Sequence, residues 1–336
     1  MSTELLILFW TAALGLAVTL YVLLDGFSLG IGILYPFAKD ESDRDLMMAT
    51  VVPVWDGNQT WLVGGGMALF TAFPKAFNLL MSALYLPLLL MVIALVFRGV
   101  AFEFRFKAKR KRIWDMAFIG GSTTAAFCQG VVLGTYIQGF TYDGTQLHIA
   151  AGGVLSPFSI FSGVAVVCAY ALLASCWLIV KTEGGLQNWA RRCARKLLPV
   201  IVIGIAAVSL WTPYVLPYVA ELWFSFPNIL LLSPIPLWTL ALVLLMGWML
   251  FRDRGREIGP FLCCIGLYLL TLAGLGISLF PYIVPRELTI WDVAAPEGSL
   301  FFAMVGVLII VPIILIYTAH AYYVFRGKTN INDVYH

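Results

Sequence analysis

The chain has 336 residues, of which 61% are hydrophobic and only 12% are charged, with 21 Lys and Arg against 18 Asp and Glu. An average soluble domain carries about 25% charged residues, and its surface needs polar groups that this chain does not supply. The mean hydropathy of +0.92 and the small net charge of +3 exclude a soluble enzyme, a disordered chain and a nucleic-acid-binding protein. The composition predicts an integral membrane protein.

Long apolar runs follow one another along the whole chain. A transmembrane helix needs about 20 mostly apolar residues, and continuous runs of this kind exclude a β-barrel. The predicted spans are 5–34, 49–73, 78–102, 114–138, 157–180, 197–219, 230–250, 260–284 and 300–325. We therefore expect one polytopic all-α membrane domain over residues 1–336, with about nine transmembrane helices. The first run lacks a basic segment before it, so we expect it to be a retained span rather than a cleaved signal peptide.

Basic residues separate the connecting segments into two sets. Of the 21 Lys and Arg residues, 19 lie after the first, third, fifth, seventh and ninth predicted spans, if Arg98 near the end of the third is counted with them. The other two are Lys75 and Arg286. Cytoplasmic loops are the ones enriched in Lys and Arg. The pattern predicts an outer N-terminus and a cytoplasmic C-terminus, which requires an odd number of spans.

Common soluble cofactor and metal motifs are missing from the sequence. There is no GxGxxG or Walker A pattern, so nucleotide-driven pumping is not expected. The six cysteines form no CxxC pair, which favours packing roles over metal ligation. Axial haem ligation needs a His, Met or Cys that faces inward at depth, and His320 is the only histidine within a predicted span. We do not expect this chain to hold haem by itself.

Four ionisable residues lie within or at the ends of the first three predicted spans: Asp25, Asp56, Arg98 and Glu103. A charge at membrane depth costs about 2.5–3.5 kcal/mol on insertion scales, so each invites a functional explanation. The predicted topology places all four in the cytoplasmic half of neighbouring spans, where carboxylates and an arginine can share protons.

Two interpretations of this group remain open. In the first, Asp56 and Arg98 form a buried ion pair that only fixes helix register. In the second, the carboxylates form a proton relay that opens to the cytoplasm, with water held by the polar residues beside Asp56. Asp115, which follows a basic run, is expected to complement a helix N-terminus or to join the same group.

Four segments make the sequence specific: DGFSLGIGILYPF, PVWDGNQTWL, ALVFRGVAFEFRFK and LTIWDV. Together they resemble subunit II of the cytochrome bd family of quinol oxidases, in its shorter, cyanide-insensitive type. The resemblance runs from about Asp25 to Tyr323. It implies two four-helix bundles plus one peripheral helix, in a heterodimer with subunit I. In that family subunit I carries the ligands of haem b and haem d and the quinol site. The resemblance also allows a small single-helix accessory subunit and, as in longer members, a structural quinone within subunit II.

The resemblance also implies roles for individual residues. Glu103 would collect protons at the cytoplasmic surface, Asp56 would pass them towards subunit I, Arg98 would be the charge partner, and Asp25 would assist. Family members commonly have DGFDLG where this chain has Ser28, so one acidic relay position is missing.

The expected function is that of a subunit of a terminal quinol oxidase in the bacterial cytoplasmic membrane. The complex would oxidise quinol, reduce oxygen to water and generate a proton motive force. A proton-coupled secondary transporter is the alternative, although such proteins often carry inverted repeats with midplane sites, and no second WDGN segment occurs here. A purely structural scaffold is a third possibility, in which Asp56 and Glu103 would be replaceable.

Overall fold

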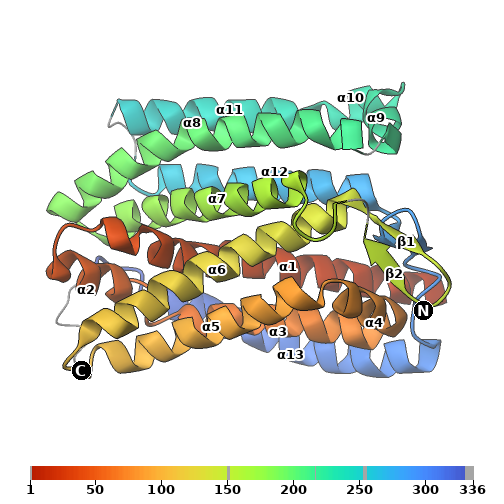
Figure 1. Cartoon of the computed structure of the whole chain (residues 1–336), viewed down its shortest axis with the longest axis horizontal. Coiled ribbons are helices and arrows are strands. Elements are labelled where there is room, and N and C mark those ends of the chain that lie inside the picture. Colours follow the sequence, from red (N-terminus) through yellow and green to blue (C-terminus); the bar gives the residue numbers. More distant parts are fainter. Residues whose placement is uncertain (1, 150–151, 216, 253–255, 330–336) are drawn as a thin grey trace.

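The computed structural model describes residues 2–149, 152–215, 217–252 and 256–329. Long helices run side by side along the longest axis of the molecule (Figure 1). They are α1 (Thr3–Leu34), α3 (Trp55–Ala72), α5 (Tyr85–Arg105), α6 (Lys111–Gln138), α7 (Pro157–Lys181), α8 (Gly184–Val215), α11 (Pro234–Phe251), α12 (Gly259–Leu279) and α13 (Glu297–Val324).

Shorter elements connect these helices at the two ends of the molecule (Figure 1). The helical connections are a 3-10 turn (Tyr35–Phe37), α2 (Glu41–Ala49), α4 (Pro74–Ala83), α9 (Pro217–Phe224) and α10 (Asn228–Leu232). Two antiparallel hairpins join β1 (Phe140–Tyr142) to β2 (Leu147–Ile149) and β3 (Tyr282–Val284) to β4 (Leu288–Thr289).

Among the described residues, eight helical segments are long and apolar enough to cross a membrane, one fewer than predicted. The difference lies at the second predicted span, 49–73. Its first residues belong to α2 and to a turn over 50–54, and helix α3 begins only at Trp55. With 18 residues, several of them polar or glycine, α3 is shorter and less apolar than α1 and α13. It nevertheless packs along α1 and α13, in line with the other long helices.

Eight of the long helices form two groups of four. Helices α7, α8, α11 and α12 contact one another in a closed ring, and α1, α3, α5 and α6 form the other group. Contacts of α7 with both α6 and α1 join the two groups, and α13 lies outside against α1 and α3. This arrangement confirms the predicted all-α membrane fold.

Small residues allow the central helices to approach closely, as is usual between membrane helices. A Cβ atom added at Gly30 in α1 would overlap the carbonyl oxygen of Tyr170 in α7. At Gly121 in α6, a Cβ would lie 2.5 Å from the carbonyl oxygen of Ala94 in α5. These contacts bring α1, α5, α6 and α7 together around the buried polar groups described below.

The basic segments gather at one end of the molecule. Helix α2, the segment 106–110 and the segment after α13 lie at this end, whereas the start of α1, α4 and both hairpins lie at the other (Figure 1). Lys75, in α4, and Arg286, between β3 and β4, belong to the second end. The charge asymmetry seen in the sequence is thus a difference between two ends of one bundle.

Candidate functional site

A fully buried ion pair joins α1 to α5. The Nη2 atom of Arg98 donates a hydrogen bond of 2.8 Å to Oδ1 of Asp25, and neither side chain is exposed to solvent. The Arg98 guanidinium also lies 5.9 Å from the ring centroid of Phe102, one turn further along α5. An isolated charge in this position would be very costly, so each member of the pair compensates for the burial of the other.

The predicted pairing of Asp56 with Arg98 is therefore wrong, because Arg98 pairs with Asp25. Helix α3 starts later than predicted, which places Asp56 in its first turn rather than deep within a helix. There the carboxylate benefits from the partial positive charge of the helix N-terminus. The Asp56 side chain is exposed on the surface of this chain.

Asp56 and Glu103 each follow an aromatic residue that joins α3 to α5. The rings of Trp55, in α3, and Phe102, in α5, stack with their centroids 4.9 Å apart, so these two helices are in contact. Asp56 directly follows Trp55, and Glu103 directly follows Phe102. Both carboxylates are exposed, and neither has an ion-pair partner within the described parts of the chain. The four predicted residues thus form two sets, a buried pair and two exposed acids.

Further polar groups surround the buried pair. Tyr21, one turn before Asp25 in α1, accepts a 2.7 Å hydrogen bond from the side-chain amide of Gln129 in α6, which in turn accepts one of 2.7 Å from the hydroxyl of Tyr170. Residue Asn58 in α3 donates to the carbonyl oxygen of Leu24. The sequence reasoning did not identify these groups, although a glutamine within an apolar span is a signal that could have done so.

Several atoms at the buried pair have no hydrogen-bond partner among the described residues. They include Oδ2 of Asp25, Nε and Nη1 of Arg98, and the hydroxyl oxygen of Ser28. Ser28 lies one turn after Asp25 and is fully buried, at the position where the family resemblance implied a missing acid. Asp25 therefore keeps one oxygen that can accept a proton while the other is held by Arg98.

A second charged cluster lies at the basic end of the bundle. Arg105 is fully buried and contacts both Asp115 and Asp45 at 2.5 Å, through Nε and Nη1 respectively. The hydroxyl of Tyr35 donates a 3.2 Å hydrogen bond to the same oxygen of Asp115. Asp115 therefore balances Arg105, and the alternative that it only complements a helix N-terminus is wrong. Because Asp45 is in α2 and Asp115 in α6, Arg105 ties both to the end of α5.

Both described histidines are exposed on the surface of this chain. His320 is exposed on α13. His148 is exposed in β2, where its Nε2 lies 2.7 Å from Oδ2 of Asp143. A hydrogen bond from the backbone N–H of Gln146, together with the contact to His148, holds the pKa of Asp143 below its usual range. His336 lies outside the described residues.

These features define a polytopic helical membrane subunit with a buried charge pair and two acids on its outer face. The chain belongs to the family of cytochrome bd terminal oxidase subunit II, whose sequence profile matches residues 6–325. It is a subunit of an oxidoreductase complex, and no match supports the transporter alternative.

The relatives are similar over nearly their full length. Cytochrome bd ubiquinol oxidase subunit 2 of Bacillus subtilis (strain 168) is 28% identical over 321 residues, which covers 92% of this chain and 93% of the relative. Cytochrome bd-I ubiquinol oxidase subunit 2 of Escherichia coli (strain K12) is 28% identical over 373 residues, covering 98% and 97%. A chain in the structure of bd oxidase from Geobacillus thermodenitrificans shares the fold, with a TM-score of 0.73 at 18% identity over 95% of this chain and 99% of that chain.

Proposed function

We propose that this chain pairs with a haem-bearing subunit I in a bacterial quinol:oxygen oxidoreductase and supplies part of its proton-uptake path. The complex oxidises quinol and reduces oxygen to water. The basic end of the bundle faces the cytoplasm, with the start of α1 outside, because Lys and Arg concentrate in cytoplasmic loops. The support for this activity is membership of the family, together with the near full-length match to ubiquinol oxidase subunits.

The observation that carries the proton path is the exposed position of Asp56 and Glu103. Ionised carboxylates are costly against lipid and in membrane proteins normally face protein or water. Here they lie beside the stacked Trp55 and Phe102 and have no ion-pair partner among the described residues. A partner subunit that covers this face of α3 and α5 provides the environment that the isolated chain does not.

In this proposal the residues act in order of depth. Glu103, near the cytoplasmic end of α5, takes up protons, and Asp56 passes them to the interface with subunit I. The Asp25–Arg98 pair holds α1 against α5 behind these acids, and the free oxygen of Asp25 can accept a proton. We assign the haems to the partner, as the family resemblance implies, and His148 and His320 are both exposed on this chain. A structural quinone and an accessory subunit stay predictions.

The class of function can be tested on the protein purified mildly from its native membrane. We expect a haem absorption spectrum and quinol-dependent oxygen uptake in the fraction that contains this chain. A haem-free preparation of this chain alone that transports a solute would contradict the assignment as an oxidase subunit.

Replacing Asp56 by asparagine is expected to slow oxygen uptake by at least about tenfold, since a positioned proton-transfer group contributes 10²-fold or more. The haem spectrum and the yield of complex should stay unchanged, because the Asp56 side chain is exposed and makes no ion pair in the described chain. The Glu103→Gln variant is expected to behave in the same way. Oxygen-electrode rates, normalised to haem content, provide the measurement.

The matched control for Asp56→Asn is Glu4→Gln. Glu4 is also an exposed acid in the first turn of a helix, but at the opposite end of the bundle. It should keep the normal rate. Normal rates of oxygen uptake in both Asp56→Asn and Glu103→Gln would show that these residues do not carry protons. That result would favour the alternative of a purely structural scaffold.

A further inference from the structure

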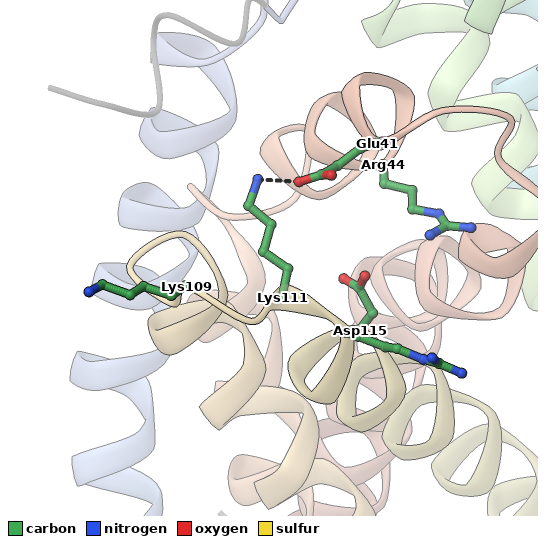
Figure 2. A pocket seen from close by; sticks show the side chains of 6 residues that line it. Glu41, Arg44, Lys109, Lys111 and Asp115 are labelled. Atoms are coloured by element: carbon green, nitrogen blue, oxygen red, sulfur yellow. Dashed lines mark ion pairs between the residues drawn. The ribbon is translucent and has the colours of Figure 1, made fainter.

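A hollow of about 410 Å³ opens at the basic end of the bundle, between α2 and the start of α6. It is lined by Glu41, Arg44, Lys109, Lys111, Arg112 and Asp115. Figure 2 shows Asp115 pointing into this hollow from α6, Arg44 extending along its edge from α2, and Lys109 directed away at the rim. No residue of the proposed proton path lines it.

The acidic groups of the hollow are already balanced. Glu41 pairs with Lys111 at 2.8 Å, and Asp115 pairs with the buried Arg105 at 2.5 Å. By contrast, Arg44, Lys109 and Arg112 have no ion-pair partner in the part of the chain that the structure describes.

The start of α6 adds backbone donors to this hollow. The first turn of α6 begins after Arg110, whose side chain provides no cap, so its backbone N–H groups are open to a ligand. An uncapped helix N-terminus beside free guanidinium groups is a favourable environment for a phosphate.

The surroundings of the hollow favour a lipid over a soluble anion. Just beyond Arg112 on α6, Ile113 and Met116 are 63% and 65% exposed, and they lie on the part of α6 that enters the predicted span. Phe104, which stacks on Trp114 with ring centroids 5.2 Å apart, is 54% exposed. Free basic groups therefore border an apolar surface, which is the arrangement that a phospholipid headgroup and its acyl chains require. Basic pockets at the cytoplasmic ends of membrane helices commonly bind anionic lipids.

We propose that this hollow binds the phosphate of an anionic phospholipid of the cytoplasmic leaflet, with Arg44, Arg112 and the first turn of α6 as the phosphate ligands. The acyl chains lie along Ile113, Met116 and Phe104. The lipid bridges α2 and α6 at the place where Arg105 already ties these two helices to α5.

The test uses the whole complex, stripped of lipid in detergent and titrated with phosphatidylglycerol or phosphatidylcholine, with bound lipid counted by native mass spectrometry. We expect preferential retention of phosphatidylglycerol. Each of Arg44→Gln and Arg112→Gln should weaken this binding about fivefold, because one basic residue near an anionic leaflet contributes about that factor. Arg256→Gln, an exposed arginine at the same end of the molecule, is the matched control and should bind normally.

Haem spectra of the variants show that the complex is intact, and Arg112→Lys, which keeps the charge, should retain the preference for phosphatidylglycerol. Equal retention of the two lipids by the unmodified complex would overturn the proposal. So would unchanged phosphatidylglycerol binding in the double variant Arg44→Gln/Arg112→Gln. Inorganic phosphate is then added as a competitor for the hollow. If it displaces phosphatidylglycerol equally well whatever the length of the acyl chains, the hollow is a site for a free anion and the lipid assignment is wrong.

Discussion

Replacing Arg98 by leucine is expected to destabilise the folded chain by about 3–5 kcal/mol, because it leaves the fully buried carboxylate of Asp25 without its charge partner. The variant should reach the membrane in reduced amount, and its complex should lose haem at a lower temperature than the unmodified protein. The measurement is the thermal midpoint of the haem absorption, together with the quantity of chain in purified membranes.

A double variant distinguishes the loss of the ion pair from the cost of leaving one buried charge unpaired. Asp25→Asn combined with Arg98→Leu removes both charges, and it should recover much of the stability that Arg98→Leu alone loses. The control is Arg326→Leu, which makes the same substitution at an exposed arginine. It should have little effect on stability. Equal loss of stability in Arg98→Leu and Arg326→Leu would show that the pair does not support the fold.

Gly30→Ala is expected to be the second most disruptive change, in spite of the small size of the added methyl group. The new Cβ would overlap the carbonyl oxygen of Tyr170, and a backbone atom in a packed helix cannot move aside as a flexible side chain can. Overpacking typically costs about 1–3 kcal/mol, and contact with backbone places this site at the upper end of that range or above it. We expect a lower thermal midpoint and a weaker association of α1 with α7.

Gly15→Ala is the matched control for this prediction, because it makes the same change in the same helix. Apart from its chain neighbours and the backbone of its own helix, no described residue has an atom within 4 Å of a Cβ built at Gly15, and alanine favours a helix over glycine. This variant should be neutral or slightly more stable. If Gly30→Ala and Gly15→Ala had the same thermal midpoint, the close approach of α1 and α7 in the structure would be wrong.

Much of the fold could be predicted because hydropathy and charge are properties of single residues. Runs of about 20 apolar residues can hardly be anything but membrane helices. The Lys and Arg residues then separated the two ends of the bundle, and the structure places the segments accordingly. The exception was the second span, where length alone did not reveal that the chain turns at 50–54 before α3 begins.

The candidate site was predicted less completely. Depth along the helices correctly selected Asp25 and Arg98 as groups that need compensation, and the structure pairs them with each other. The same reasoning failed for Asp56, because the late start of α3 moves this residue to an exposed first turn. It also could not reveal that Arg105 joins Asp45 and Asp115, which lie far apart in the sequence.

The sequence by itself determined that this is a multi-pass helical membrane protein, which residues are charged at depth, and which family its motifs resemble. These conclusions depend on composition, on the length of apolar runs and on contiguous segments. Only the tertiary structure decided which charged residues form pairs. The faces that come into contact depend on the rotation of each helix about its axis and on where one helix ends and the next begins. That choice buries Asp25 with Arg98 and turns Asp56 and Glu103 outwards to the surface that we assign to the partner subunit.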